Sequence, residues 1–358
     1  MKTCLSCGLE NPDAPVQCAA CGSKLPISKP PEPPKESPGD NLKLKYVDFG
    51  LLGEIFAINE GYPYPDWRKI WNYIEEHVQR SCWRDAWRES AIQWLEKLRT
   101  ARETKYFLVE SDNFFLVSRQ GESVRKEILS FAEKVRQLIQ NRLRGVKFKE
   151  TFGKQVLIIF EGIEDYYQYI SYFYPDGTHA ISMGVFLPKG YAHIALPFYD
   201  ARNTRTALVH ELVHNAIFTL PIPRWLNEGL ARIFELQVSA VRGTGFDQDM
   251  DIAGEHRKYW TSNNIQAFWS GKAFDSPESV KLSYSLSNIL IHLVATEKGD
   301  FKGFLQNATY LDGGSLAFKN AYDKSLGQIA GIFLGDGDWN PRPEVISLQF
   351  AKKNREDG

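Results

Sequence analysis

Two stretches decide the expected fold of this chain: Val209-His210-Glu211-Leu212-Val213-His214 and, after a turn, Trp225-Leu226-Asn227-Glu228-Gly229-Leu230-Ala231. Residues four positions apart on a helix differ by about 40° in direction and share one face. His210 and His214 therefore direct two imidazoles to one point, as a single Zn²⁺ ion requires. Glu211 lies about 100° from His210, where it can reach a water at the ion without binding the ion itself.

A catalytic zinc site usually has three protein ligands and one open position. The candidate third ligand is Glu228. The turn Pro221–Pro223 ends the first helix, and a second helix is expected to begin near Trp225, with Glu228 facing back across the turn. Arg232 and Glu235 share the face of Glu228 within about 40°, so they are candidates to orient it.

Together these residues resemble the gluzincin branch of the zincin metallopeptidases. The closer resemblance is to the peptidase MA-like domains, in which a His-Glu-x-x-His helix precedes a Trp-Leu-x-Glu-Gly-Leu-Ala helix. The resemblance extends over roughly residues 104–334. It implies that His210, His214 and Glu228 bind a catalytic zinc ion and that Glu211 is the general base of a zinc metallopeptidase.

The implied reaction is hydrolysis of a peptide bond by a metal-activated water, with Glu211 moving the proton to the leaving nitrogen. The oxyanion needs a further donor. Tyr284 is the candidate, because related aminopeptidases use a tyrosine from a later helix. The alternative for Tyr284, Asn288 and His292 is an ordinary polar helix stripe, and His256 is a second candidate donor.

Zincins also pair the backbone of an extended substrate with an edge strand that precedes the zinc helix. Here Val185–Leu187 and His193–Leu196 are predicted to form a hairpin, and the expected edge strand is the one that contains His193. One position departs from the thermolysin-like pattern, because Arg232 stands where those enzymes carry an Asp. Their substrate preference therefore does not transfer to this chain.

A second metal site is predicted at the N-terminus from Cys4, Cys7, Cys18 and Cys21. Two Cys-x-x-Cys pairs, each followed by Gly, suit tetrahedral Zn²⁺ at about 2.3 Å, and so short a segment depends on the metal for folding. The pattern resembles the short zinc ribbons of many prokaryotic N-termini. We expect a structural ribbon over residues 1–25, a candidate surface for a protein partner; free thiols or a redox motif are the alternatives.

The rest of the chain is expected to be α+β. Six prolines over residues 26–41 predict an extended linker. Residues 42–103 are expected to be mainly helical, as amphipathic helices packed on a larger body or, alternatively, as a tryptophan-lined recognition surface. Residues 104–335 are predicted to form a zincin-like domain with a mixed sheet and then a helical lobe, and residues 336–358 a polar tail.

Composition narrows the function further. The 358 residues are 43% hydrophobic and carry a net charge of −1, which gives no basic surface for nucleic acid. No apolar run reaches the ~18–20 residues of a membrane helix, and the N-terminus lacks the apolar core of a signal peptide. The expected protein is a cytoplasmic peptidase with two zinc ions, one catalytic and one structural, that acts on peptides or proteins. The alternative is a non-catalytic zinc-binding scaffold or adaptor.

Overall fold

A computed structural model describes residues 2–3, 10–11, 46–101, 106–148, 152–175, 183–238 and 251–346. The chain divides into two units, Met1–Leu44 and Lys45–Gly358. In the first unit, the described strands β1 (Lys2–Thr3) and β2 (Glu10–Asn11) pair antiparallel. The four cysteines of the predicted ribbon and the predicted linker lie outside the described residues, as does the end of the predicted tail.

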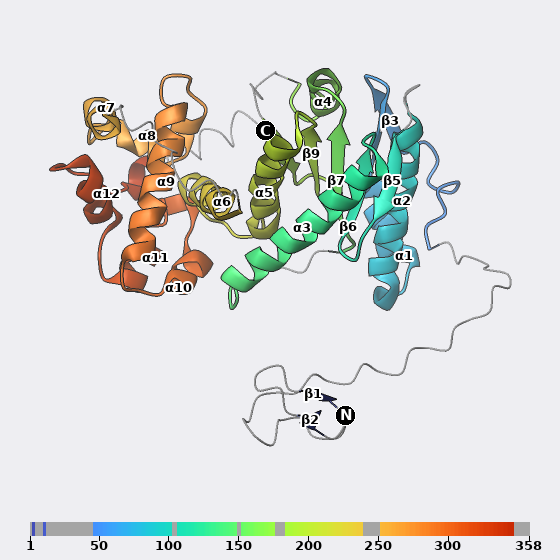
Figure 1. Cartoon of the computed structure of the whole chain (residues 1–358), viewed down its shortest axis with the longest axis horizontal. Helices are drawn as coiled ribbons and strands as arrows, with labels where there is room; N and C mark the ends of the chain where they lie inside the picture. Colours follow the sequence, from blue (N-terminus) through green and yellow to red (C-terminus); the bar gives the residue numbers. More distant parts are fainter. Residues whose placement is uncertain are drawn as a thin grey trace. The chain divides into compact units, whose positions relative to one another are not determined.

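The second unit is α+β, as predicted, and contains a mixed five-stranded sheet (Figure 1). The strand order is β5 (Phe107–Glu110), β6 (Phe114–Ser118), β7 (Gln155–Phe160), β9 (His193–Pro197) and β8 (Val185–Leu187). The three inner strands are parallel, and the two outer strands are antiparallel to their neighbours. Each inner strand is a nearly continuous apolar run because both of its faces are buried.

The expectation that His193 lies in the edge strand is wrong. Its strand, β9, pairs with β7 on one side and with β8 on the other, so β8 is the outer strand. The hairpin itself was predicted correctly. Both of its strands are short and apolar, so the sequence does not show which of them pairs with the parallel strands.

Helices cover both faces of the sheet, with α3 (Glu122–Arg142) and α5 (Ala201–Ile217) on one side (Figure 1). The other face is covered by α2 (Trp83–Thr100) and α4 (Ile163–Ile170). Side chains alternate between these layers: Leu157 and Ile159 pack with α3 and α5, whereas Val156 and Ile158 pack with α2 and α4.

The segment before the sheet contains the two expected helices, α1 (Trp67–His77) and α2. It also contains an unpredicted hairpin of β3 (Phe56–Asn59) and β4 (Tyr62–Pro65), so the helical prediction is wrong there. The turn residues Glu60 and Gly61 both have positive φ, 49° and 78°, as a two-residue hairpin turn requires. The hairpin forms because Tyr62 and Tyr64 are buried against aromatic rings of β7 and α4.

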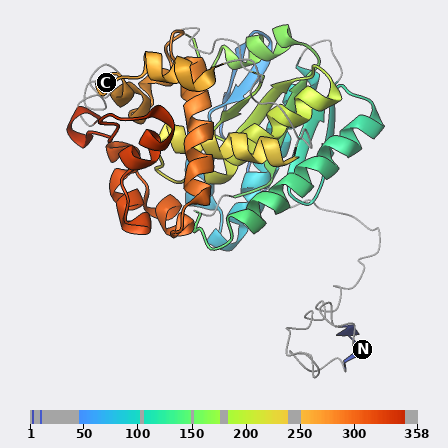
Figure 2. The same ribbon diagram turned by 60° about the vertical axis from the view of Figure 1, so that its left-hand side comes forward.

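After α5 the described residues are mainly helical, as predicted, and form a lobe beside the sheet (Figure 2). It comprises α6 (Arg224–Val238), α7 (Ile252–Tyr259), α8 (Ile265–Trp269), α9 (Val280–Thr296), α10 (Phe301–Asn307), α11 (Ser315–Tyr322) and α12 (Leu326–Leu334). None of the helices in the described residues has the length and hydrophobicity that crossing a bilayer requires.

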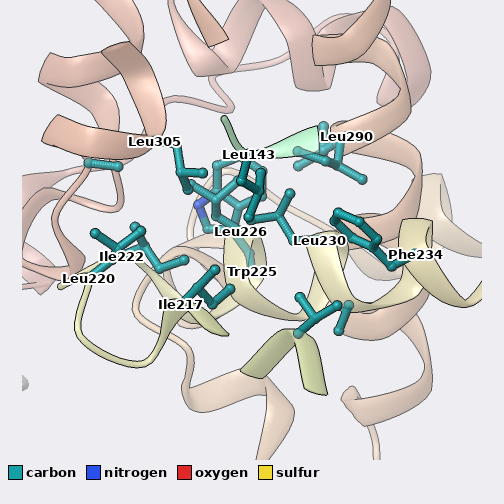
Figure 3. Packing of buried hydrophobic residues seen from close by; sticks show 14 of the residues in the cluster. Leu143, Ile217, Leu220, Ile222, Trp225, Leu226, Leu230, Phe234, Leu290 and Leu305 are labelled. Atoms are coloured by element: carbon teal, nitrogen blue, oxygen red, sulfur yellow. The ribbon is translucent and has the colours of Figure 1, made fainter. Parts of the chain in front are cut away.

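The buried Trp225 anchors α6 in this lobe (Figure 3). Its indole N–H donates to the Gly313 carbonyl at 3.0 Å, and its ring packs on Trp269 and Phe304. Gly229 allows α6 to approach α9, because a Cβ there would lie 2.9 Å from the backbone oxygen of Ser287. Packing therefore sets the position of α6, and with it that of Glu228.

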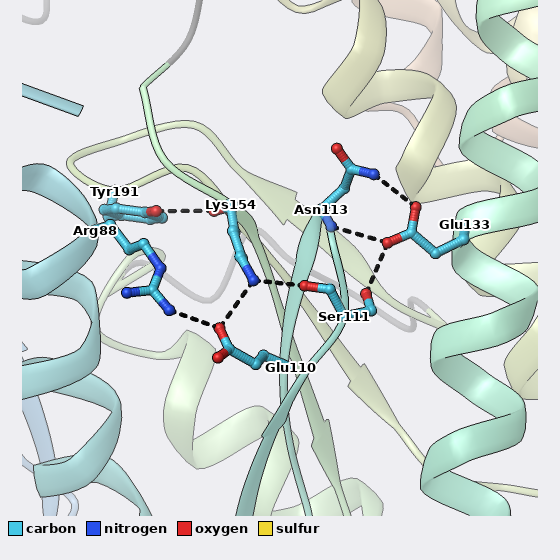
Figure 4. A network of polar contacts seen from close by, with 7 residues as sticks. All are labelled: Arg88, Glu110, Ser111, Asn113, Glu133, Lys154 and Tyr191. Carbon is cyan, nitrogen blue, oxygen red and sulfur yellow. Dashed lines mark hydrogen bonds and ion pairs between the residues drawn. The ribbon is translucent and has the colours of Figure 1, made fainter. Parts of the chain in front are cut away.

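A polar network holds the start of the sheet to its helices (Figure 4). Glu133 of α3 accepts hydrogen bonds from the backbone and the amide of Asn113, at 2.9 and 2.8 Å. Glu110 of β5 accepts from Arg88 of α2 and from Lys154, both at 2.9 Å. These contacts join α2 and α3 to the turn between β5 and β6 and to the segment that enters β7.

Candidate metal centre

His210 and His214 of α5 meet Glu228 of α6. Their Nε2 atoms lie 3.3 and 3.5 Å from the same oxygen, Glu228 Oε2. One potential ligand atom from each residue lies within 4.8 Å of the others. The structure thus brings together the three residues that were predicted to bind a catalytic metal.

The other nitrogen of each imidazole contacts an oxygen of α6. His210 Nδ1 lies 2.5 Å from Glu235 Oε1, and His214 Nδ1 lies 2.5 Å from Asn227 Oδ1. An oxygen acceptor keeps a proton on Nδ1, so loss of the second proton would leave the Nε2 lone pair for a metal. Both Nε2 atoms face Glu228.

The surroundings of Glu228 fit a cation. Its Oε2 is buried and faces the two imidazole Nε2 atoms. Burial alone would raise the pKa of Glu228, but the two imidazoles outweigh burial and lower it, so the carboxylate stays ionised. Two imidazole nitrogens and one carboxylate oxygen are a donor set that catalytic zinc sites use.

Glu211 lies beside this group on α5 and is buried. Burial raises its pKa, which favours a carboxyl group that can take up a proton, although the neighbouring histidines oppose the rise. The backbone N–H of Phe186 in β8 donates to the Glu211 carboxylate. Gly184 lies against Glu211, since a Cβ there would be 3.4 Å from Glu211 Cγ. The candidate general base therefore faces the outer strand.

A second polar group lies on the other side of Glu228. Arg224 Nε is 3.8 Å from Glu228 Oε1, and its Nη1 is 2.5 Å from Asp275 Oδ1. Tyr284 of α9 packs edge-on against Phe274, whose ring also lies 5.0 Å from the Arg224 guanidinium carbon. Burial and the charge of Glu228 raise the pKa of Tyr284 to about 12, so its phenol remains a hydrogen-bond donor near neutral pH.

Two residues of this group were missed from the sequence, Arg224 and Asn227. Arg224 is the first residue of α6 and lies four positions before Glu228, so helical spacing could have indicated it. Asn227 precedes Glu228, but its contact with His214 depends on how α5 and α6 cross, which spacing does not reveal.

The prediction that Arg232 and Glu235 orient Glu228 is wrong. Glu235 contacts His210, and Arg232 pairs with Glu235. The two helices run in opposite directions, so His214 meets the start of α6 and His210 meets a later turn.

The remaining candidate histidines lie apart from Glu228. His256 of α7 accepts the Trp260 indole N–H at Nδ1, and its Nε2 lies 3.0 Å from Ser285 Oγ. His193 Nδ1 lies 2.7 Å from the Tyr191 carbonyl, and its Nε2 lies 2.8 Å from Tyr169 Oη. Both rings use both nitrogens within the core, so neither is positioned to donate to a substrate.

No protein-family model matches the chain, and no curated protein matches it. The resemblance to metallopeptidases therefore depends on the motif residues and on the arrangement described above.

Proposed function

We propose that the protein is a zinc-dependent peptidase of the gluzincin type. The observation that carries the proposal is the convergence of two imidazole Nε2 atoms on one buried carboxylate oxygen, with each imidazole held at Nδ1 by another side chain of α6. His210, His214 and Glu228 would hold the ion. Zn²⁺ bound there supplies Lewis acidity, which polarises a carbonyl and acidifies a water.

The chain's own residues would perform the proton transfers. Glu211, with its raised pKa, would accept a proton from the attacking water at its carboxylate and deliver it to the leaving amine. Tyr284 would donate its phenolic hydrogen to the developing oxyanion. The outer strand β8 begins beside Glu211 and would pair with the backbone of an extended peptide.

The test compares Glu211→Gln with the unaltered chain and with a surface control, Glu75→Gln on α1. We expect all three proteins to bind equal amounts of zinc at the proposed site. Hydrolysis of a fluorogenic peptide library should fall about 10²–10⁴-fold in Glu211→Gln only, because a glutamine cannot accept the proton.

Hydrolysis at the unaltered rate in Glu211→Gln would show that this mechanism is wrong. If the unaltered chain binds zinc but cleaves no peptide, the scaffold or adaptor alternative is the better account.

A further inference from the structure

A cavity of about 750 Å³ lies on the sheet face opposite α5. It is lined by the β3–β4 hairpin, the start of α1, the segment that follows α4 and the β8–β9 turn. Its volume is within the range of ligand-binding pockets. Its wall includes the rings of Phe56, Tyr64, Trp67, Trp94, Tyr172 and Phe173. We call it the aromatic cavity.

The polar groups of two of these rings bind backbone carbonyls. Tyr64 Oη donates to the Tyr169 carbonyl at 2.7 Å, and the Trp94 indole N–H donates to the Pro63 carbonyl at 3.1 Å. These two rings therefore offer an occupant mainly their faces and edges. An aromatic side chain suits such a wall, because aromatic pairs gain about 0.5–1.5 kcal/mol beyond the burial of their area.

Trp67 separates the aromatic cavity from a neighbouring cavity of about 490 Å³. Gly190 of the β8–β9 turn lies against this indole. Its φ is +74°, and a Cβ there would be 2.1 Å from Trp67. The close contact fixes the position of the turn relative to the cavity wall.

The rim of the aromatic cavity carries two exposed cations, Arg68 and Lys189. Neither forms an ion pair within the described residues, whereas Lys69 pairs with Asp66 at 3.7 Å. Glu54 is the opposing exposed charge at the rim. This excess of positive charge favours a ligand with an acidic group next to its aromatic group.

The outer strand connects the aromatic cavity with the candidate metal centre. Gly184, just before β8, lies against Glu211, and Lys189 and Gly190, just after β8, line the cavity. β8 is three residues long and rises roughly 10 Å, and the turn that contains Lys189 and Gly190 follows it. A peptide paired along β8 from Glu211 would therefore reach the aromatic cavity a few residues from the metal centre.

We propose that the aromatic cavity binds an aromatic side chain, flanked by an acidic residue, a few residues from the peptide bond that is cut. This inference rests on the proposed function, because it assumes that the substrate runs along β8. It specifies the substrate class: extended peptides with an aromatic–acidic anchor remote from the cleavage position.

The first test measures binding of fluorescent peptides that contain either Phe-Asp or Ala-Ala at one position. Glu211→Gln provides a background without turnover. Ala57→Trp fills the cavity from an exposed position on β3. Ile58→Trp is the matched control, because Ile58 is the next residue, is 67% exposed and does not line the cavity.

We expect the Phe-Asp peptide to bind about tenfold tighter than the Ala-Ala peptide, a difference of about 1.4 kcal/mol. Ala57→Trp should remove this difference and Ile58→Trp should retain it. Equal binding of the two peptides, or equal behaviour of the two variants, would overturn the inference.

The second test moves the Phe-Asp pair along a long peptide, one residue at a time, and maps the cleavage position by mass spectrometry with the unaltered chain. The cut should move with the pair at a constant spacing. Cleavage at a position independent of the pair would refute the cavity's role and leave the peptidase proposal standing. Phe-Asp binding without any cleavage would refute the peptidase proposal and its β8 route, and leave only a peptide-binding cavity.

Discussion

Two pairs of histidines in the second unit differ in what their ring nitrogens contact. In His210 and His214, Nδ1 contacts Glu235 or Asn227, respectively, and Nε2 faces Glu228. In His193 and His256, which are more deeply buried, both nitrogens have neutral partners in the core. The arrangement of partners, and not the extent of burial, distinguishes the candidate ligands.

The electrostatics follow the same division. Nearby carboxylates raise the pKa values of His210 and His214 against the effect of burial. Burial lowers the pKa values of His193 and His256 to about 4, because no charge compensates for it. A histidine surrounded by carboxylates can exchange a proton for a cation, whereas one surrounded by rings and hydroxyls stays neutral and structural.

The largest effect should come from removing a ligand. His214→Ala should lower the zinc affinity of the candidate metal centre by several orders of magnitude, because two protein ligands then remain. His256→Gln is the control and should leave zinc affinity unchanged. Competition with a chromophoric chelator measures the zinc affinity of both variants. Equal zinc affinity in the two variants would show that His214 is no more a zinc ligand than His256.

The next effect concerns the pH dependence of stability. An unfolded histidine titrates near pH 6.5 and folded His193 near pH 4, so the unfolded chain alone gains a proton between these values. The contribution of neutral His193 to the free energy of unfolding is complete above pH 6.5. It is lost as the pH falls toward 4, and the loss amounts to roughly 3 kcal/mol.

Urea unfolding between pH 7 and 4 would measure this loss, and His193→Gln should make the dependence shallower. His210→Gln is the comparison from the other pair, His210 and His214. This variant should not make the pH dependence of the free energy of unfolding shallower. An unchanged slope in His193→Gln would show that its imidazole is not held neutral.

The smallest effect should come from the groups that orient the ligands. Glu235→Leu and Asn227→Leu should each weaken zinc binding about 10–100-fold, because each removes the acceptor that holds one imidazole. Glu235→Gln keeps an acceptor and should lose less. If both Leu variants bind zinc like the unaltered chain, the contacts with α6 do not set the orientation of the imidazoles.

Part of the local structure could be predicted from the sequence. The hairpin of β8 and β9 and the two motif helices are local signals, and α6 begins at Arg224, one residue before its predicted start. The hairpin at Phe56–Pro65 escaped prediction, because its tyrosines are stabilised by rings of β7 and α4 that are distant in sequence.

The sequence by itself determined which side chains could serve as ligands, since four-residue spacing places His210 and His214 on one helix face wherever that helix packs. Only the tertiary structure decided their partners: Asn227 for His214, Glu235 for His210 and β8 as the outer strand. The physical reason is that these contacts depend on the crossing of antiparallel helices and the order of strands, which packing sets across long stretches of chain.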